Sequence, residues 1–191
     1  MDTDRLAGLA VGLGADVPVF VRGLAAGAEG VGERLVPITL EQPWYVLIVL
    51  PFAVSTAEVF RARALTRNTP RIRMNELLGG GPGVPDSPVR VDRLLAAGRN
   101  DCEPVVREMH PRVGEAIDWL SGYSRARMTG TGATVFAPFG SRKRAVEVAG
   151  AVPAPWRGVV AKGLNRSPLL DVTVGAGARS ASAPRAVNLG V

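Results

Sequence analysis

One continuous apolar run, residues 44–50 (Trp-Tyr-Val-Leu-Ile-Val-Leu), constrains the fold of this chain more than any other segment. Its aromatic and β-branched side chains, followed directly by Pro51, are typical of a central strand in a sheet. The apolar stretch is far shorter than the roughly 20 residues that span a bilayer. We therefore predict a buried strand and no membrane partner.

A helix is predicted directly after this strand, over residues 55–65. Ser55 and Glu58 have the spacing of a capping box, and Val54 and Val59 occupy the positions of a hydrophobic staple. Thr56 lies four residues before Phe60, which places both on one face of the helix.

The elements after residue 87 complete a sheet of one recognisable type. Helices are predicted over 87–97, 103–109 and 111–120, a strand pair over 125–128 and 134–137, a helix over 141–149 and a last strand over 158–163. The order is a strand and a helix, a helical insertion, and then strand, strand, helix, strand. This order predicts an α+β fold with a ferredoxin-like split βαβ arrangement.

The N-terminal part is predicted to present one carboxylate. A short helix over 6–13, closed by Gly14, leads to Asp16, and the glycine-punctuated apolar segments over 17–38 suggest strands and close turns. A carboxylate so placed is expected to lie near buried backbone, where an acid is costly unless it has a bonding partner or a functional role. The alternative is an Asp that only closes a turn.

Composition limits the possible partners and compartments. The net charge is +6, but the basic residues, all arginines except Lys143 and Lys162, are scattered, which disfavours a nucleic-acid-binding stripe. The single cysteine, Cys102, and the single histidine, His110, form no cluster, so no metal site is predicted. A reducing cytoplasm and a chain without a secretion signal are expected.

Two low-complexity segments receive no site. The glycine-rich stretch 79–85 contains Pro82 and Pro85, which lack the N–H groups that a phosphate loop needs, so we predict a surface connection. Residues 171–191, rich in Ala, Gly and Ser, are expected to form a disordered tail.

Several motifs together resemble one enzyme family. In order they are Leu-Gly-Ala-Asp-Val-Pro-Val-Phe at 13–20, Gly-Ala-Glu-Gly-Val-Gly-Glu at 27–33, Arg-Asn-Thr-Pro at 67–70, Asn-Asp at 100–101, Met-Thr-Gly-Thr-Gly-Ala-Thr-Val-Phe-Ala at 128–137 and Ala-Lys-Gly-Leu-Asn at 161–165. The chain resembles the later part of the 4-diphosphocytidyl-2-C-methyl-D-erythritol kinases, a family of the GHMP kinase superfamily. The match runs from about residue 6 to residue 170, so chance agreement explains it poorly.

The resemblance implies an activity and its reactants. Members transfer a phosphoryl group from ATP, with Mg²⁺, to the 2-hydroxyl of their cytidine diphosphate-linked methylerythritol substrate, in the non-mevalonate route to isoprenoids. The family's catalytic Lys and its Gly-rich, Ser-containing phosphate loop have no counterpart in these 191 residues. The expectation is therefore that this polypeptide alone is inactive.

The same resemblance implies site residues. Asp16 matches the catalytic aspartate that orients or deprotonates the attacking hydroxyl. The loop containing Thr129, Gly130, Thr131 and Gly132 is expected to line the active site. Without the resemblance, this segment reads as a plain hairpin turn.

Three further residues are assigned to substrate binding. Thr56 and Phe60 correspond to residues near the cytidine, with the Phe60 ring stacked on the base, and Val31 lies near the substrate. On its sequence alone, Phe60 could equally be a core residue of an amphipathic helix.

The domain organisation that follows has three parts. Residues 1–42 are the remnant of an N-terminal kinase domain that carries Asp16, residues 43–170 are the GHMP kinase C-terminal domain, and residues 171–191 are the tail. Two other functions stay open: a catalytically silent ferredoxin-like binding module, and a GHMP kinase with a different alcohol substrate.

Overall fold

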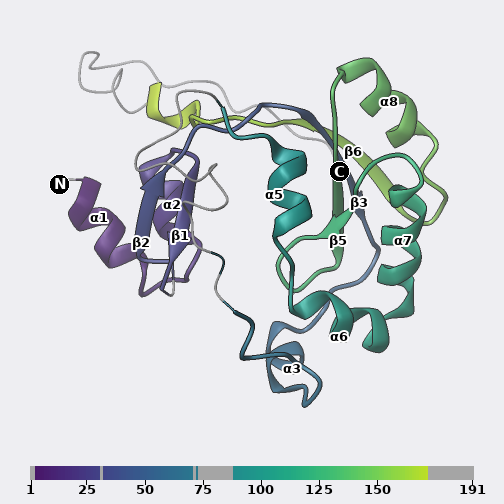
Figure 1. The fold of residues 1–191 in the computed structure, drawn as a ribbon, viewed down its shortest axis with the longest axis horizontal. Coiled ribbons are helices and arrows are strands. Elements are labelled where there is room, and N and C mark those ends of the chain that lie inside the picture. The colour runs from purple at the N-terminus through teal and green to yellow at the C-terminus, as the bar shows by residue number, and fades with distance from the viewer. Residues whose placement is uncertain (1–2, 31, 71, 73–87, 172–191) are drawn as a thin grey trace, which may run out of the picture. The chain divides into compact units, whose positions relative to one another are not determined.

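A computed structural model describes residues 3–30, 32–70, 72 and 88–171, and divides them into two compact units. One unit comprises the described residues up to Pro37 together with those from Arg166 onward; the other spans Ile38–Asn165. Figure 1 shows the elements of both. The three-part domain organisation stays a prediction. Val31, the glycine-rich stretch 79–85 and the tail after residue 171 lie outside the described residues.

The Ile38–Asn165 unit is built on a four-stranded antiparallel sheet. Its strands are β3 (Trp44–Val49), β4 (Arg127–Met128), β5 (Thr134–Phe139) and β6 (Arg157–Lys162), in the order β4-β5-β3-β6. The predicted central strand β3 pairs along its whole length with β5 on one side and β6 on the other. This order is that of a ferredoxin-like fold, so the predicted fold class is confirmed.

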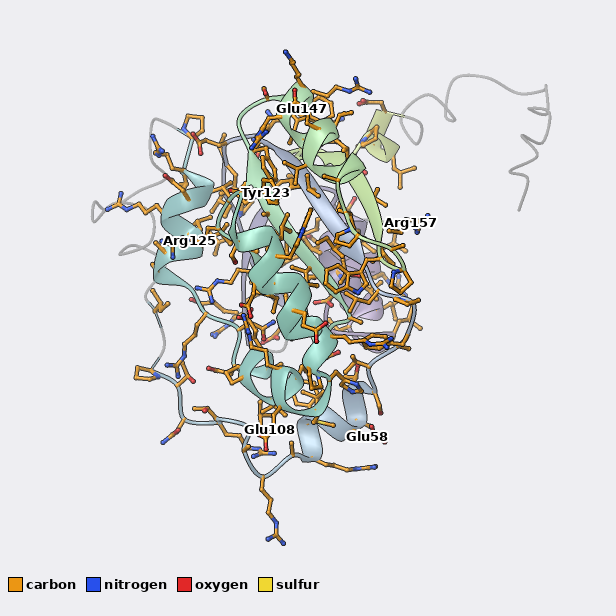
Figure 2. The ribbon with its side chains drawn as sticks, turned by 90° about the vertical axis from the view of Figure 1, so that its right-hand side faces the viewer. Glu58, Glu108, Tyr123, Arg125, Glu147 and Arg157 are labelled. Carbon is orange, nitrogen blue, oxygen red and sulfur yellow. The ribbon has the colours of Figure 1, made fainter. Side chains whose placement is uncertain are left out.

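Two helices cover one face of this sheet. They are α7 (Pro111–Ser121) and α8 (Arg142–Gly150), which lie on the same side of the strands in Figures 1 and 2. Alternate residues of β3 and β5 are buried against them, as a sheet with one packed face requires. The fully or nearly fully buried side chains of this core include Val46, Ile48, Val113, Ile117, Leu120, Val135 and Val148.

Three shorter helices complete the unit: α3 (Thr56–Arg61), α5 (Val91–Ala97) and α6 (Cys102–Met109). The predicted cap of α3 is present, because the Ser55 hydroxyl accepts a hydrogen bond from the Glu58 backbone N–H at 3.4 Å. The prediction that a helix begins at residue 87 is wrong. Val89 instead forms a β-bridge with Leu40, and the helix begins at Val91 once that extended pairing ends.

The first unit contains a helix where a strand was predicted. After Asp16 the chain forms α2 (Val17–Arg22), with Pro18 in its first turn and Gly23 as a left-handed C-cap at φ 63°. The β-branched composition of this segment favours a strand, but proline in the first turn and glycine after the last are the signals of a short helix. These end signals prevail, so the strand prediction is wrong.

Three more elements belong to the first unit. The helix α1 (Thr3–Ala10) ends before the predicted stop at Gly14, and it buries Ala7 and Ala10 while Leu9 and Leu13 stay exposed. The strands β1 (Ala26–Glu29) and β2 (Arg34–Pro37) form an antiparallel hairpin, as the glycine pattern suggests. None of the helices in the described ranges has the length and apolar character needed to cross a membrane.

The core described above predicts the effect of one truncation. Leu120 in α7 is fully buried, so Leu120→Ala should lower the free energy of unfolding by about 2–5 kcal/mol, through lost apolar burial and the cavity left behind. Urea unfolding followed by circular dichroism measures this loss. Leu164→Ala is the matched control, because Leu164 is 56% exposed and its truncation should change stability by less than about 0.5 kcal/mol. Equal losses for both variants would contradict the assigned core.

Candidate functional site

Asp16 stands at the N-terminal end of α2. It is the N-cap residue, its side chain makes no capping hydrogen bond, and it is exposed in the structure. The expectation that it lies near buried backbone is wrong, because a helix rather than a buried strand follows it. An exposed carboxylate at the start of a helix is free to meet a ligand and lies at the end of the helix that favours negative charge.

The backbone beside Asp16 is held by the β1–β2 turn. Gly32 has a φ of 99°, and a Cβ atom at this position would lie 2.1 Å from the carbonyl oxygen of Ala15. Only glycine tolerates both the left-handed conformation and this close approach. The turn therefore packs closely against the residue that directly precedes Asp16.

The helix α3 presents Phe60 to solvent. The side chain of Phe60 is 57% exposed, whereas Val59 beside it is fully buried. The alternative interpretation of Phe60 as a core residue is therefore wrong for this structure. A large aromatic ring left on the surface of a small helix is available to stack on a ligand.

The C-terminal end of α3 is closed by an arginine. The Arg67 guanidinium donates to the carbonyl oxygens of Phe60 at 2.7 Å, Ala62 at 3.3 Å and Leu65 at 3.1 Å. Carbonyls at a helix end have no partner within the helix, and a cation is favourable there. Arg67 thus holds the backbone of the residue that carries the exposed ring.

The loop between β4 and β5 is tight and glycine-dependent. Gly130 and Gly132 adopt φ values of 54° and 89°, and the Gly132 N–H donates to the Thr129 carbonyl at 2.9 Å. Its side chains are small, so a ligand can approach its backbone closely. This loop is the predicted segment containing Thr129, Gly130, Thr131 and Gly132.

The loop and α3 meet through their threonines. The hydroxyl oxygens of Thr56 and Thr131 are 2.9 Å apart and share a hydrogen bond, although 75 residues separate them in sequence. The structure thus brings together the two predicted regions that lie in the Ile38–Asn165 unit. Asp16 belongs to the other unit.

A residue to which sequence analysis assigned no role also contacts this loop. The Asn100 amide donates to the carbonyl oxygens of Met128 at 3.1 Å and Gly130 at 2.7 Å, while its own oxygen accepts the Cys102 N–H at 3.0 Å. The available signal was an Asn two residues before a helix, where side-chain-to-backbone bonding is common. That signal predicts a cap but not the distant loop.

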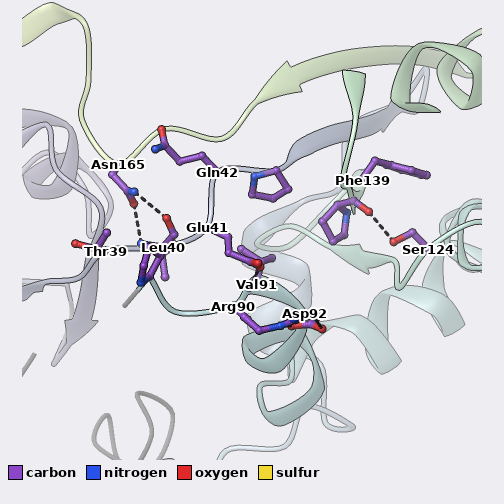
Figure 3. Close-up of a pocket in the computed structure, with 14 residues that line it drawn as sticks. Thr39, Leu40, Glu41, Gln42, Arg90, Val91, Asp92, Ser124, Phe139 and Asn165 are labelled. Atoms are coloured by element: carbon purple, nitrogen blue, oxygen red, sulfur yellow. Dashed lines mark hydrogen bonds and ion pairs between the residues drawn. The ribbon is translucent and has the colours of Figure 1, made fainter. Parts of the chain in front are cut away.

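A hollow of about 580 Å³ lies at the end of the strands opposite to α3 and the 129–133 loop (Figure 3). Pro43 and Phe139 line it at one end of β3 and β5. The other end, where α3 follows β3 and the 129–133 loop precedes β5, lies roughly 17 Å away for strands of this length. Its polar side chains bond to neighbouring groups: Glu41 accepts the Val91 N–H at 3.1 Å, and Arg90 pairs with Asp92 at 2.6 Å. These bonds indicate a structural role for the polar side chains that line the hollow.

Cys102 and His110 lie outside any cluster of metal-binding side chains. Burial, followed by the charge of Asp101, raises the pKa of the Cys102 thiol, which keeps it protonated at neutral pH. His110 joins α6 to α7 and stacks on Phe52 with 5.6 Å between ring centroids. Within the ranges that the structure describes, no group of three or more His, Cys, Asp or Glu side chains could hold a metal ion.

Comparison with known proteins gives one consistent family. Residues 88–158 match the model described as GHMP kinases C terminal. Relatives named 4-diphosphocytidyl-2-C-methyl-D-erythritol kinase include that of Nitrosococcus oceani, 46% identical over 90% of this chain and 55% of the relative, and that of Ectopseudomonas mendocina, 48% identical over 87% of this chain and 52% of the relative. The chain thus spans about half the length of the curated relatives it matches.

A solved structure agrees with these relatives. The crystal structure of a 4-(cytidine 5'-diphospho)-2C-methyl-D-erythritol kinase superposes with a TM-score of 0.63 at 27% identity, covering 83% of this chain and 57% of that one. The matched family segment, residues 88–158, lies wholly within the Ile38–Asn165 unit.

The close fit beside Asp16 yields a prediction. Gly32→Ala should destabilise the hairpin and displace the backbone at Ala15, because the new methyl group meets a carbonyl oxygen and the positive φ costs about 1–2 kcal/mol. Thermal unfolding and the amide chemical shifts of residues 15–17 measure the two effects. Gly8→Ala is the matched control, since a Cβ at Gly8 meets nothing within 4 Å. Unchanged shifts at residues 15–17 in Gly32→Ala would show that the turn does not position Asp16.

Proposed function

We propose that this chain is part of a GHMP kinase and takes part in the ATP-dependent phosphorylation of the 2-hydroxyl of 4-diphosphocytidyl-2-C-methyl-D-erythritol. The match of residues 88–158 to the GHMP kinases C terminal model supports the proposal, and so does the similarity of nine tenths of the chain to 4-diphosphocytidyl-2-C-methyl-D-erythritol kinases. The proposed reaction belongs to the non-mevalonate synthesis of isoprenoid precursors, and its proposed location is the cytoplasm. One observation carries the proposal: the exposed Phe60 lies on the helix whose Thr56 contacts the glycine-rich loop.

The exposed ring suits the cytidine part of this substrate. Stacking of a base on an aromatic side chain contributes about 1–3 kcal/mol, and it needs a ring face open to solvent. Phe60 offers such a ring. It lies in the last turn of α3, where Arg67 bonds to its backbone carbonyl. Thr56, one turn away, adds a hydroxyl that can donate or accept a hydrogen bond. Val31 is proposed to lie near the same substrate.

The loop with Thr129, Gly130, Thr131 and Gly132 suits the phosphate side of the site. Backbone N–H groups in a glycine-rich turn can approach phosphate oxygens without obstruction by side chains. Its contact with Thr56 places this loop next to the proposed base-binding helix. One ligand that carries both a base and phosphates can therefore touch both elements.

Asp16 is proposed to orient the attacking hydroxyl and to receive its proton. The substrate oxygen bonds to the γ-phosphorus of ATP, the bond to the bridging oxygen breaks, and ADP leaves. Phosphoryl transfer depends mainly on positioning and charge stabilisation, so a fixed carboxylate near the hydroxyl is a sufficient contribution from this unit. The exposed position of Asp16 and the fixed backbone before it support the role.

ATP is proposed as the phosphoryl donor, and Mg²⁺ as the ion that accompanies it. Mg²⁺ would accompany ATP and neutralise phosphate charge, but the described residues hold no cluster of side chains that fits a metal ion. No described residue is therefore assigned as a metal ligand.

Substrate recognition predicts the effect of one substitution. In a catalytically active protein that contains this chain, Phe60→Ala should weaken binding of the cytidine substrate by about 5- to 150-fold and leave ATP binding unchanged, because stacking on the base is lost. Isothermal titration with each ligand measures both constants. Phe60→Tyr keeps the ring and should bind like the parent protein. Equal losses for both ligands would show a general structural role and contradict the proposal.

The catalytic assignment predicts a second effect. The assay follows substrate-dependent ADP release and identifies the product by mass spectrometry, using this polypeptide by itself and joined to the N-terminal segment of the Nitrosococcus oceani relative. We expect activity only from the joined protein, and a loss of about 10²- to 10⁴-fold in kcat for Asp16→Asn. A joined protein that folds and binds substrate but keeps its kcat after Asp16→Asn would remove Asp16 from catalysis. Activity of the polypeptide by itself would contradict the expectation that it is inactive alone.

A further inference from the structure

The turn that precedes α6 contacts both halves of the proposed substrate site. It comprises Arg99, Asn100 and Asp101, which none of the proposed roles above includes. We propose that Asn100 is a positioning residue for the 129–133 loop, and that Asp101 and Thr69 couple this loop to α3. The proposal rests on the proposed function, because it concerns the same site.

Asn100 holds the loop through its backbone. Its amide group donates to the carbonyl oxygens at both ends of the Met128–Gly130 stretch, at 3.1 and 2.7 Å. The neighbouring Glu103 adds a third bond, because its carboxylate accepts the Met128 N–H at 3.1 Å. Since Thr131 directly follows Gly130, these bonds fix the residue that contacts α3.

Asp101 ties the same turn to the segment after α3. Its carboxylate accepts the Thr69 hydroxyl at 2.6 Å and pairs with Arg99 at 2.9 Å, and Arg99 also donates to the Thr69 hydroxyl. Two residues before Thr69, Arg67 bonds to the Phe60 carbonyl. The contacts of Asp101 therefore lead back to the residue that carries the exposed ring.

These hydrogen bonds, together with the short chain segments between them, close a ring. From α3 the ring runs through Thr56 to Thr131, along the loop to Asn100, through Asp101 to Thr69, and through Arg67 back to α3. A closed network restrains each member more than an open chain of the same bonds, because each member is held from two sides. Movement of the loop is thus linked to movement of the base-binding helix.

The network explains two sequence motifs at once. Arg-Asn-Thr-Pro at 67–70 and Asn-Asp at 100–101 are far apart in sequence, and each supplies one side of the same contacts. Neither needs to touch the ligand. Their effect on catalysis would come from the position of the loop, where a displacement of about 1 Å can cost about 100-fold in rate.

Asn100→Asp tests the positioning role. The substitution keeps an oxygen for the Cys102 N–H but replaces the donating amide by a carboxylate that faces two carbonyl oxygens. We expect backbone amides of the loop to exchange hydrogen roughly tenfold faster, because two hydrogen bonds are lost. In the joined protein, kcat should fall by about 10- to 100-fold while KM for ATP stays within about twofold.

The control is Glu147→Gln in α8, which breaks an exposed ion pair with Arg144 at 3.3 Å. Glu147 lies at the other end of the molecule from Glu58 on α3 in Figure 2. This variant should leave loop exchange and kcat unchanged. Asn100→Asp with parent-like loop exchange would overturn the positioning role, and so would a fall in melting temperature without a change in kcat.

Thr69→Val and Thr69→Ser test the coupling. Valine removes the hydroxyl whose hydrogen bond Asp101 accepts, so amides of the 129–133 loop should exchange faster although residue 69 bonds to Asp101 and Arg99, which lie outside the loop. Serine keeps the hydroxyl and should restore slow exchange. Parent-like loop exchange in Thr69→Val would overturn the coupling. Hydrogen exchange needs no substrate, so failure of the proposed kinase activity would leave this test intact.

Discussion

The pairing of β3 on both of its edges is the interaction on which the rest of the Ile38–Asn165 unit depends. The strand bonds to β5 and β6 over the same residues, Trp44–Val49, so its backbone is satisfied without solvent and its apolar side chains can be buried. This strand ends at Val49, and α3 follows it after residues 50–55. The helix that carries the exposed Phe60 is therefore the next element after the central strand of the sheet.

The candidate site of this unit lies at strand ends, as ligand sites in α/β folds do, although its sheet is antiparallel. Strands supply rigidity, while the connections after them are free to vary in sequence and conformation. In this unit, α3 leaves the end of β3, and the 129–133 loop joins β4 to β5 beside it. The hydrogen bond between Thr56 and Thr131 joins α3 to the loop, and Asn100, in the turn before α6, bonds to the loop backbone.

Sequence patterns predicted the sheet and most of its helices because those elements have unmistakable periods and caps. The apolar run at Trp44, the cap at Ser55 and the glycine-rich loop at Gly130 all appear as expected. The pattern failed at α2, where the β-branched residues after Val17 were given more weight than Pro18 and Gly23 at the helix ends. It also failed at residues 88–90, because the bridge between Val89 and Leu40 is a non-local contact that no local signal encodes.

Predicting the site residues required the family resemblance in addition to the residue patterns. The resemblance to a kinase family supplied Asp16, Thr56, Phe60 and the loop, whereas the residues alone left each with a structural alternative. The exposure of Phe60 could not be known from its helical face, since burial depends on what the rest of the chain places over that face. The contact of Asn100 with the loop could not be predicted from its motif, because the loop it bonds to lies about thirty residues away.

One side chain joins the two ends of the Ile38–Asn165 unit. Asn165 accepts the Leu40 N–H at 2.9 Å and donates to the Leu40 carbonyl at 2.8 Å, as one strand would pair with another (Figure 3). The chain therefore enters and leaves this unit at the same point. Topologically, the unit is an insert that could be removed, transplanted or circularly permuted as one piece, because closing the gap between its ends requires no rearrangement of the strands inside it.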